Sequence, residues 1–115
     1  MVEHVLRAVE AVPPGRVTTY GAVAELVGAT ARQVGSVMRY YGSNVTWWRV
    51  VSATGELPDH LRTAAAEQWE REGIECKSDG RGCRVGDYRV DPLQWGERYA
   101  EAASDLPRYE RTPRR

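Results

Sequence analysis

Apolar residues near the start of the chain repeat at the spacing of amphipathic helices. The first run covers residues 2–12 and stops at a Pro-Pro-Gly sequence, which does not continue a helix. Thr18 and Thr19 are suitable N-caps for a second helix, and Gly28 is a suitable residue for its C-terminus. Tyr20 lies at the start of this second helix, on its apolar stripe. The pattern predicts two helices that pack against a common core.

A third helix is predicted over residues 31–41, with Thr30 as its N-cap. Its two faces differ in character. The apolar face comprises Val34, Val37, Met38 and Tyr41, and the small, basic face comprises Arg32, Gly35, Ser36 and Arg39. A helix, a short glycine-containing turn and a second helix form the helix-turn-helix pattern, whose second helix commonly enters a DNA groove. The basic face is therefore a candidate DNA-binding surface.

The remainder of the chain predicts short strands and one further helix. The helix covers residues 61–72 and ends at Gly73; its acidic residues indicate either a docking surface or a solvated face. A turn is predicted at residues 52–55. Short strands, rich in β-branched residues or next to turn signals, are predicted at residues 45–51, 74–77 and 84–90.

The length of 115 residues fits one domain, which we place at residues 1–104. Residues 105–115 are polar and arginine-rich with little to bury, so we expect a disordered tail. The chain has no apolar run long enough to cross a bilayer, and its first residues lack the pattern of a signal peptide. We therefore expect a cytoplasmic protein, associated with the nucleoid if the source is bacterial.

Charge is distributed unevenly along a chain whose formal net charge is zero. No acidic residue lies between Glu25 and Glu56, whereas Arg32, Arg39 and Arg49 fall in that interval. One face of a neutral protein can therefore be positive, although a chance gap in acidic residues would give the same pattern.

The two cysteines, Cys76 and Cys83, lie in a glycine-rich stretch without the spacing of a zinc site. We interpret them as reduced thiols, with a disulfide across a hairpin as the alternative. We expect no metal and no cofactor.

The segment from Pro14 to Val51 resembles the DNA-binding domain of the O6-alkylguanine-DNA alkyltransferase family, in the stretches PPGRVTTYGAVAELVG, ARQVGSVMR and VTWWRVV. In that family the last stretch contains Pro-Cys-His-Arg-Val, in which the cysteine accepts the alkyl group and the histidine helps to generate its thiolate. Here Thr46, Trp47 and Trp48 replace the proline, cysteine and histidine. An indole supplies neither nucleophile nor base. The sequence thus looks like the alkyltransferase-like proteins, which carry tryptophan at the cysteine position.

The resemblance implies a fold that is mainly α with short β strands: a winged-helix-like helix-turn-helix domain of the alkyltransferase C-terminal type. It also implies a non-enzymatic protein that docks in the minor groove of double-stranded DNA, flips O6-alkylguanine out of the helix and marks it for nucleotide excision repair proteins. Nothing in the sequence demands more than a monomer. Two alternatives remain at this point. One is an active DNA alkyltransferase with an unrecognised nucleophile, and the other is a helix-turn-helix transcription regulator, which would need base-reading side chains on its recognition helix.

The resemblance assigns roles to individual residues. Arg32 would fill the space left by the flipped base, Tyr20 would press on the adjacent phosphate, and Trp47 would form a wall of the base pocket. Trp48 fits a core position. The implied DNA-binding set is Thr18, Thr19, Tyr20, Arg32, Gly35, Ser36 and Arg39, although Thr18 and Thr19 could simply cap a helix and Arg39 could be a solvated charge. The implied flipped-base pocket is Tyr20, Trp47, Arg49, Val50, Ser52 and His60, in which Arg49 would brace the pocket through hydrogen bonds and His60 would reach its rim.

The loop at residues 56–60, Glu-Leu-Pro-Asp-His, departs from the Tyr-Ser-Gly-Gly type of loop that closes the pocket in true alkyltransferases. This difference leads to the hypothesis of a wider pocket that accepts bulkier alkyl groups.

Overall fold

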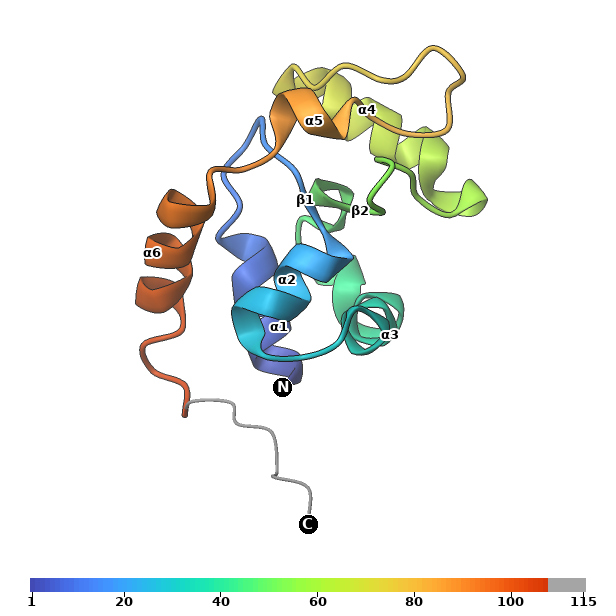
Figure 1. Ribbon diagram of the computed structural model, residues 1–115. Helices are drawn as coiled ribbons and strands as arrows, with labels where there is room; N and C mark the ends of the chain where they lie inside the picture. The colour runs from blue at the N-terminus through green and yellow to red at the C-terminus, as the bar shows by residue number, and fades with distance from the viewer. Residues whose placement is uncertain (108–115) are drawn as a thin grey trace.

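A computed structural model describes residues 1–107 of the protein (Figure 1). Helices dominate the fold, and the sheet has only two short parallel strands. The α-helices are α1 (Val2–Glu10), α2 (Tyr20–Val27), α3 (Ala31–Tyr41), α4 (Arg62–Glu72), α5 (Val85–Tyr88) and α6 (Pro92–Ala102). The strands are β1 (Thr18–Thr19) and β2 (Val50–Val51), and the 3-10 helices are η1 (Gly42–Asn44), η2 (Trp47–Arg49) and η3 (Asp59–Leu61). This confirms the predicted mainly helical fold class with short strands.

Local sequence signals set the ends of the helix-turn-helix. Thr19 caps α2 by accepting a hydrogen bond from the Ala22 amide, and Gly28 ends the helix in the left-handed conformation, with φ of 80°. Thr30 and Gln33 form a reciprocal capping box at the start of α3. These side chains satisfy amide groups that a helix end leaves unpaired, so both helices begin where the sequence predicts.

The core has two parts that meet at the small sheet. Helices α1, α2, α3 and α6 enclose the larger cluster, and the smaller one lies beneath α4, towards α5 (Figure 1). Successive residues of a strand point to opposite faces, and β2 uses this property. Val50 belongs to the larger cluster and Val51 to the smaller one. The pair β1 and β2, with Thr18 opposite Val50 and Thr19 opposite Val51, therefore joins the helix-turn-helix to the C-terminal part of the chain.

Several local predictions are wrong. Residues 45–51 form a strand only at β2, because Trp47–Arg49 is wound into η2 by a hydrogen bond from the Arg49 amide to the Thr46 carbonyl. The segment 84–90 contains the short helix α5. Tyr41, expected on the apolar face of α3, is 54% exposed, since it lies in the last turn as the chain leaves the core for η1.

The C-terminal third also departs from the sequence analysis. The predicted strand at residues 74–77 is reduced to an isolated antiparallel bridge between Cys76 and Cys83. Helix α6 begins with Asp91 as N-cap and Pro92 in its first turn. Of the predicted tail, Asp105 is ion-paired with Arg7 at 2.7 Å, and residues 108–115 lie outside the described part of the chain. No helix in residues 1–107 has the length and apolar character required to span a membrane.

Candidate nucleic-acid interface

The solvent-facing side of α3 carries the small, basic face predicted from the sequence. Arg32, Ser36 and Arg39 are exposed, while Val34 and Val37 are buried against the larger core cluster. Gly35 lies on this outer side, and a Cβ added to it would meet no heavy atom within 4 Å. Packing within the protein therefore does not require glycine here, although glycine within a helix costs about 1 kcal/mol relative to alanine. Close approach of another molecule to α3 would explain why glycine is present at this position.

A cavity of about 830 Å³ opens beside α3. This volume lies within the range of roughly 300–1,000 Å³ typical of sites for small organic groups. Four predicted pocket residues line it: Tyr20, Trp47, Ser52 and His60. Its walls come from the start of α2, the outer face of α3, η2 and the segment that leads into α4.

The cavity also includes residues that the sequence analysis did not assign to a pocket. The α3 side contributes Gly35, Met38, Arg39, Gly42 and Ser43, and the opposite side contributes Glu56, Leu57, Pro58 and Leu61. Met38 was assigned only to the apolar face of the helix, which its half-buried position explains. The unusual composition of residues 56–60 was the one available signal for the opposite wall, since this is the segment that departs from the family's loop.

Arg49 and Val50 do not line the cavity, which corrects the predicted pocket set. Val50 is fully buried in the core, and Arg49 is only 8% exposed. Of the two roles considered for the threonines of β1, the structure shows helix capping for Thr19. Thr18 is 1% exposed, so its side chain lies away from solvent, and Thr19 accepts a hydrogen bond from the Ala22 amide with its hydroxyl at the start of α2.

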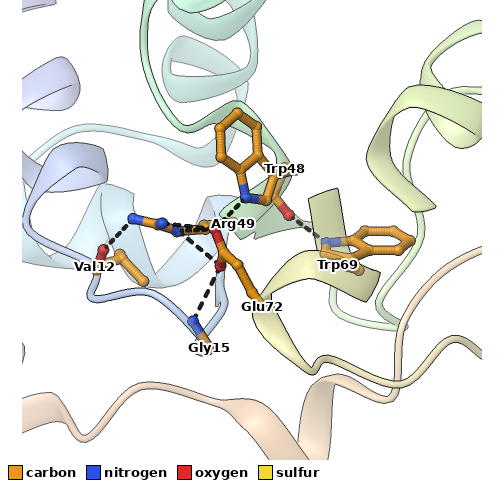
Figure 2. A network of polar contacts seen from close by, with 6 residues as sticks. All are labelled: Val12, Gly15, Trp48, Arg49, Trp69 and Glu72. Carbon is orange, nitrogen blue, oxygen red and sulfur yellow. Dashed lines mark hydrogen bonds and ion pairs between the residues drawn. The ribbon is translucent and has the colours of Figure 1, made fainter. Parts of the chain in front are cut away.

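Arg49 instead belongs to a buried polar network centred on Glu72, the last residue of α4 (Figure 2). The Arg49 Nη2 atom lies 2.6 Å from Glu72 Oε2, and Arg49 Nη1 donates to the Val12 carbonyl at 2.9 Å. The Glu72 carboxylate also accepts hydrogen bonds from the Gly15 amide at 3.0 Å and from Trp48 Nε1 at 2.9 Å. One carboxylate thus connects α4, η2 and the loop that precedes β1.

The pKa of Glu72 reflects two opposing effects. Burial raises the pKa of a carboxyl group, but the hydrogen bonds from Arg49, Gly15 and Trp48 favour the charged form and together hold the Glu72 pKa below its ordinary value. Glu72 is therefore ionised at neutral pH and balances the buried guanidinium.

The two adjacent tryptophans have different surroundings. Trp47 lines the cavity, whereas Trp48 lies behind it and is not part of the lining. Their rings meet edge to face, with centroids 5.7 Å apart and an interplanar angle of 85°. Trp48 is held by Glu72 through its indole N–H and by Trp69, whose Nε1 donates to the Trp48 carbonyl at 2.7 Å (Figure 2). The structure thus places Trp47 on the cavity wall and Trp48, half-buried, against the smaller core cluster.

Tyr20 lies at the first position of α2 and is half-buried at the cavity. Burial raises the pKa of its phenol, so the hydroxyl is neutral at neutral pH and can donate a hydrogen bond. Its place at a capped helix N-terminus also favours a nearby phosphate.

Neither cysteine lies at the cavity. Both are free, Cys76 at the surface and Cys83 buried. Burial raises the pKa of Cys83 to about 11, and burial together with the charge of Glu70 raises that of Cys76. Both thiols are therefore protonated at neutral pH, which is the less nucleophilic state. The described residues contain no cluster of histidine, cysteine or carboxylate side chains that could hold a metal ion.

Comparison with known proteins identifies the first two thirds of the chain. The sequence model of the family described as "6-O-methylguanine DNA methyltransferase, DNA binding domain" matches residues 1–75. No curated protein sequence matched the chain.

Among solved structures, the fold is similar to that of Atl1 from S. pombe. One structure shows that protein in complex with damaged DNA containing O6-carboxymethylguanine; it has 28% sequence identity and a TM-score of 0.67, and the match covers 79% of this chain and 94% of that one. A second, of S. pombe ATL in complex with DNA, has 31% identity and a TM-score of 0.66 with the same coverage.

Proposed function

The chain belongs to the family of the 6-O-methylguanine DNA methyltransferase DNA-binding domain, and from this premise we propose that it binds O6-alkylguanine in duplex DNA without removing the alkyl group. The observation that carries the proposal is the position of Trp47, an indole on the wall of a cavity beside the recognition helix α3. A flat indole offers stacking and apolar area to a purine and its alkyl substituent. The structural similarity to proteins in complex with DNA, one of them damaged, supports the same function.

O6 of guanine lies on the major-groove edge of the base pair. A protein that docks in the minor groove therefore contacts the alkyl group only if the damaged base leaves the helix. In this proposal α3 docks in the minor groove and the flipped base enters the cavity between Tyr20 and Trp47. Gly35 lets the backbone of α3 approach the DNA. Arg32 is exposed at the start of α3, with no protein partner among the described residues, and fills the space left by the base.

Two properties would favour the alkylated base over guanine. Alkylation at O6 weakens pairing with cytosine, so extrusion costs less for the lesion. The alkyl group then gains apolar contact in the cavity, at about 25 cal/mol for each Å² removed from water. Binding of this kind is an equilibrium and requires no turnover.

The alternative of an alkyl transfer enzyme needs a nucleophile at the cavity. The cavity lining contains no cysteine, and both thiols elsewhere have raised pKa values. These observations favour a lesion-binding protein. We extend the proposal to its consequence in the cell: a protein that holds the lesion without repairing it marks the site for nucleotide excision repair proteins.

The test is binding at fixed salt to a short duplex with one O6-methylguanine and to its undamaged twin, with the methyl group quantified in the same mixtures. Selective binding with the methyl group retained is the expected result. Loss of the methyl group would establish an enzyme, and equal binding to both duplexes would leave a general DNA-binding domain.

Two arginine substitutions, one at the proposed site and one away from it, extend this test. Replacement of the filling side chain by Arg32→Ala should lower lesion affinity by about tenfold or more, because flipping costs a few kcal/mol that the inserted side chain offsets. Arg71→Ala removes another exposed arginine, in the last turn of α4, and serves as the control. Equal effects of the two substitutions would mean that Arg32 contributes only charge.

A further inference from the structure

We infer that Trp48 is a positioning residue for the lesion pocket: its hydrogen bond to Glu72 fixes the indole against which the pocket wall Trp47 is oriented. The expected effect of Trp48 on lesion binding rests on the proposed function. Trp48 does not itself line the cavity, so any effect on the bound base passes through Trp47.

Trp47 is oriented by packing, against the ring of Trp48 and against the smaller core cluster. Its backbone amide is bonded to the Val45 carbonyl, but its indole Nε1 has no hydrogen-bond partner among residues 1–107. The ring is half-buried and one side of it faces the cavity. The ring packs edge to face against Trp48, with the two ring centroids 5.7 Å apart. A side chain on the pocket wall that is held by packing, without a hydrogen bond, keeps its orientation only if the groups that it packs against are themselves fixed.

Trp48, in contrast, is fixed from several directions. Glu72 accepts its indole N–H at 2.9 Å, and the Arg49 guanidinium lies 5.6 Å from the centre of its ring. Trp69 holds its backbone carbonyl at 2.7 Å. Figure 2 shows the Trp48 indole N–H pointing at the Glu72 carboxylate. A hydrogen bond to a charged acceptor is stronger than one between neutral groups, so this contact restricts rotation of the ring.

Glu72 is itself immobilised, which makes it a suitable anchor. Its carboxylate is held by Arg49 and by the Gly15 amide, and its side chain is only 11% exposed. The anchor is therefore a pre-organised acceptor rather than a solvated carboxylate. Glu72 therefore fixes Trp48, Trp48 orients Trp47, and Trp47 contacts the bound base.

Two substitutions at position 48 separate positioning from packing. Trp48→Phe and Trp48→His both replace the indole with a smaller ring, and only histidine retains a ring N–H that can donate to Glu72. Trp95→Phe is the matched control, because it removes another buried indole hydrogen bond, from Trp95 Nε1 to the Ala8 carbonyl at 2.8 Å, away from the cavity.

Two measurements are made on each protein: affinity for the O6-methylguanine duplex and its undamaged twin, and the order of the Trp47 indole N–H by ¹⁵N relaxation in the free protein. Trp48→Phe is expected to mobilise Trp47 and to lower lesion affinity about tenfold, with binding to undamaged DNA unchanged. Trp48→His should restore most of both properties, and Trp95→Phe should alter neither.

Unchanged lesion affinity in Trp48→Phe would overturn the inference, as would equal losses in Trp48→Phe and Trp48→His or an equal loss in Trp95→Phe. If the unmodified protein shows no preference for the lesion, the proposed function fails. In that case the mobility of the Trp47 indole N–H in the two Trp48 variants, measured by ¹⁵N relaxation, tests by itself whether Trp48 positions Trp47.

Discussion

The Arg49 guanidinium and the Glu72 carboxylate form a 2.6 Å ion pair whose side chains are only 10% and 11% exposed. The pair joins η2, which carries the pocket tryptophan, to the end of α4, twenty-three positions away in the sequence. Desolvation of two charges opposes folding, and here their mutual attraction is supplemented by hydrogen bonds from Trp48 and Gly15 to the carboxylate. The arrangement ties the two core clusters together behind the cavity.

Removal of one member of this pair should strongly destabilise the protein. Glu72→Ala leaves the Arg49 charge buried without its partner, and we expect the free energy of unfolding to fall by about 3–5 kcal/mol in urea titrations. The control is Glu75→Ala, which breaks the exposed pair with Arg84 and should change stability by about 0–1 kcal/mol. Similar losses in both variants would show that the buried pair contributes no more to the free energy of unfolding than the exposed pair.

The same carboxylate predicts a pH dependence. Because the folded-state pKa of Glu72 is lower than that of the unfolded chain, its contribution to stability is fully present above the unfolded value of about 4.3 and is lost as pH falls through the folded value. The unfolding free energy of the unmodified protein should therefore exceed that of Glu72→Gln by an amount that shrinks on acidification below about pH 5.

Asp105 also has a lowered pKa, through its hydrogen bond with Arg7, but it is present in both proteins and its effect cancels in the difference. A stability difference that stays constant from neutral to acidic pH would contradict the assignment to Glu72.

The parts of the fold that depend on short-range chemistry were predictable from the sequence. Thr30 caps α3 and Gly73 ends α4 because each acts on backbone groups within a turn of itself. The basic face of α3 followed from residue spacing alone. These signals need no knowledge of the rest of the fold.

Features that depend on distant residues were not predictable in this way. Trp47 and Trp48 have β propensity, yet they form a tight turn because one ring faces the cavity and the other reaches Glu72. Arg49 was expected to brace the pocket through hydrogen bonds, and its partner in the structure is Glu72, outside the lining. Nothing in the local sequence indicates which carboxylate a buried arginine will find.

Arg39 offers a test of how DNA is held, since its side chain is exposed at the cavity edge and stacks on Tyr40 at 5.5 Å. If it contacts a phosphate, Arg39→Ala should weaken binding to damaged and undamaged duplexes alike. The slope of log affinity against log salt should also fall by about 0.9, the value for one phosphate contact. An unchanged slope would identify Arg39 as a solvated charge, and a loss confined to the damaged duplex would place it in lesion recognition.

The cysteines give a final, independent check on the proposal that the protein does not transfer the alkyl group. Burial raises the pKa of Cys83 to about 11, and Cys76 is exposed with a pKa that is also raised. A disulfide reagent such as dithionitrobenzoate, which reacts with thiolates, should therefore modify Cys76 slowly at neutral pH and Cys83 only after unfolding.

The double variant Cys76→Ser with Cys83→Ala should keep its preference for the O6-methylguanine duplex, because neither thiol lies at the cavity. Rapid labelling of Cys83 in the folded protein would contradict its burial and raised pKa. Methylation of either thiol after incubation with the damaged duplex would mean that a cysteine reaches the bound base and that the protein is an alkyltransferase after all.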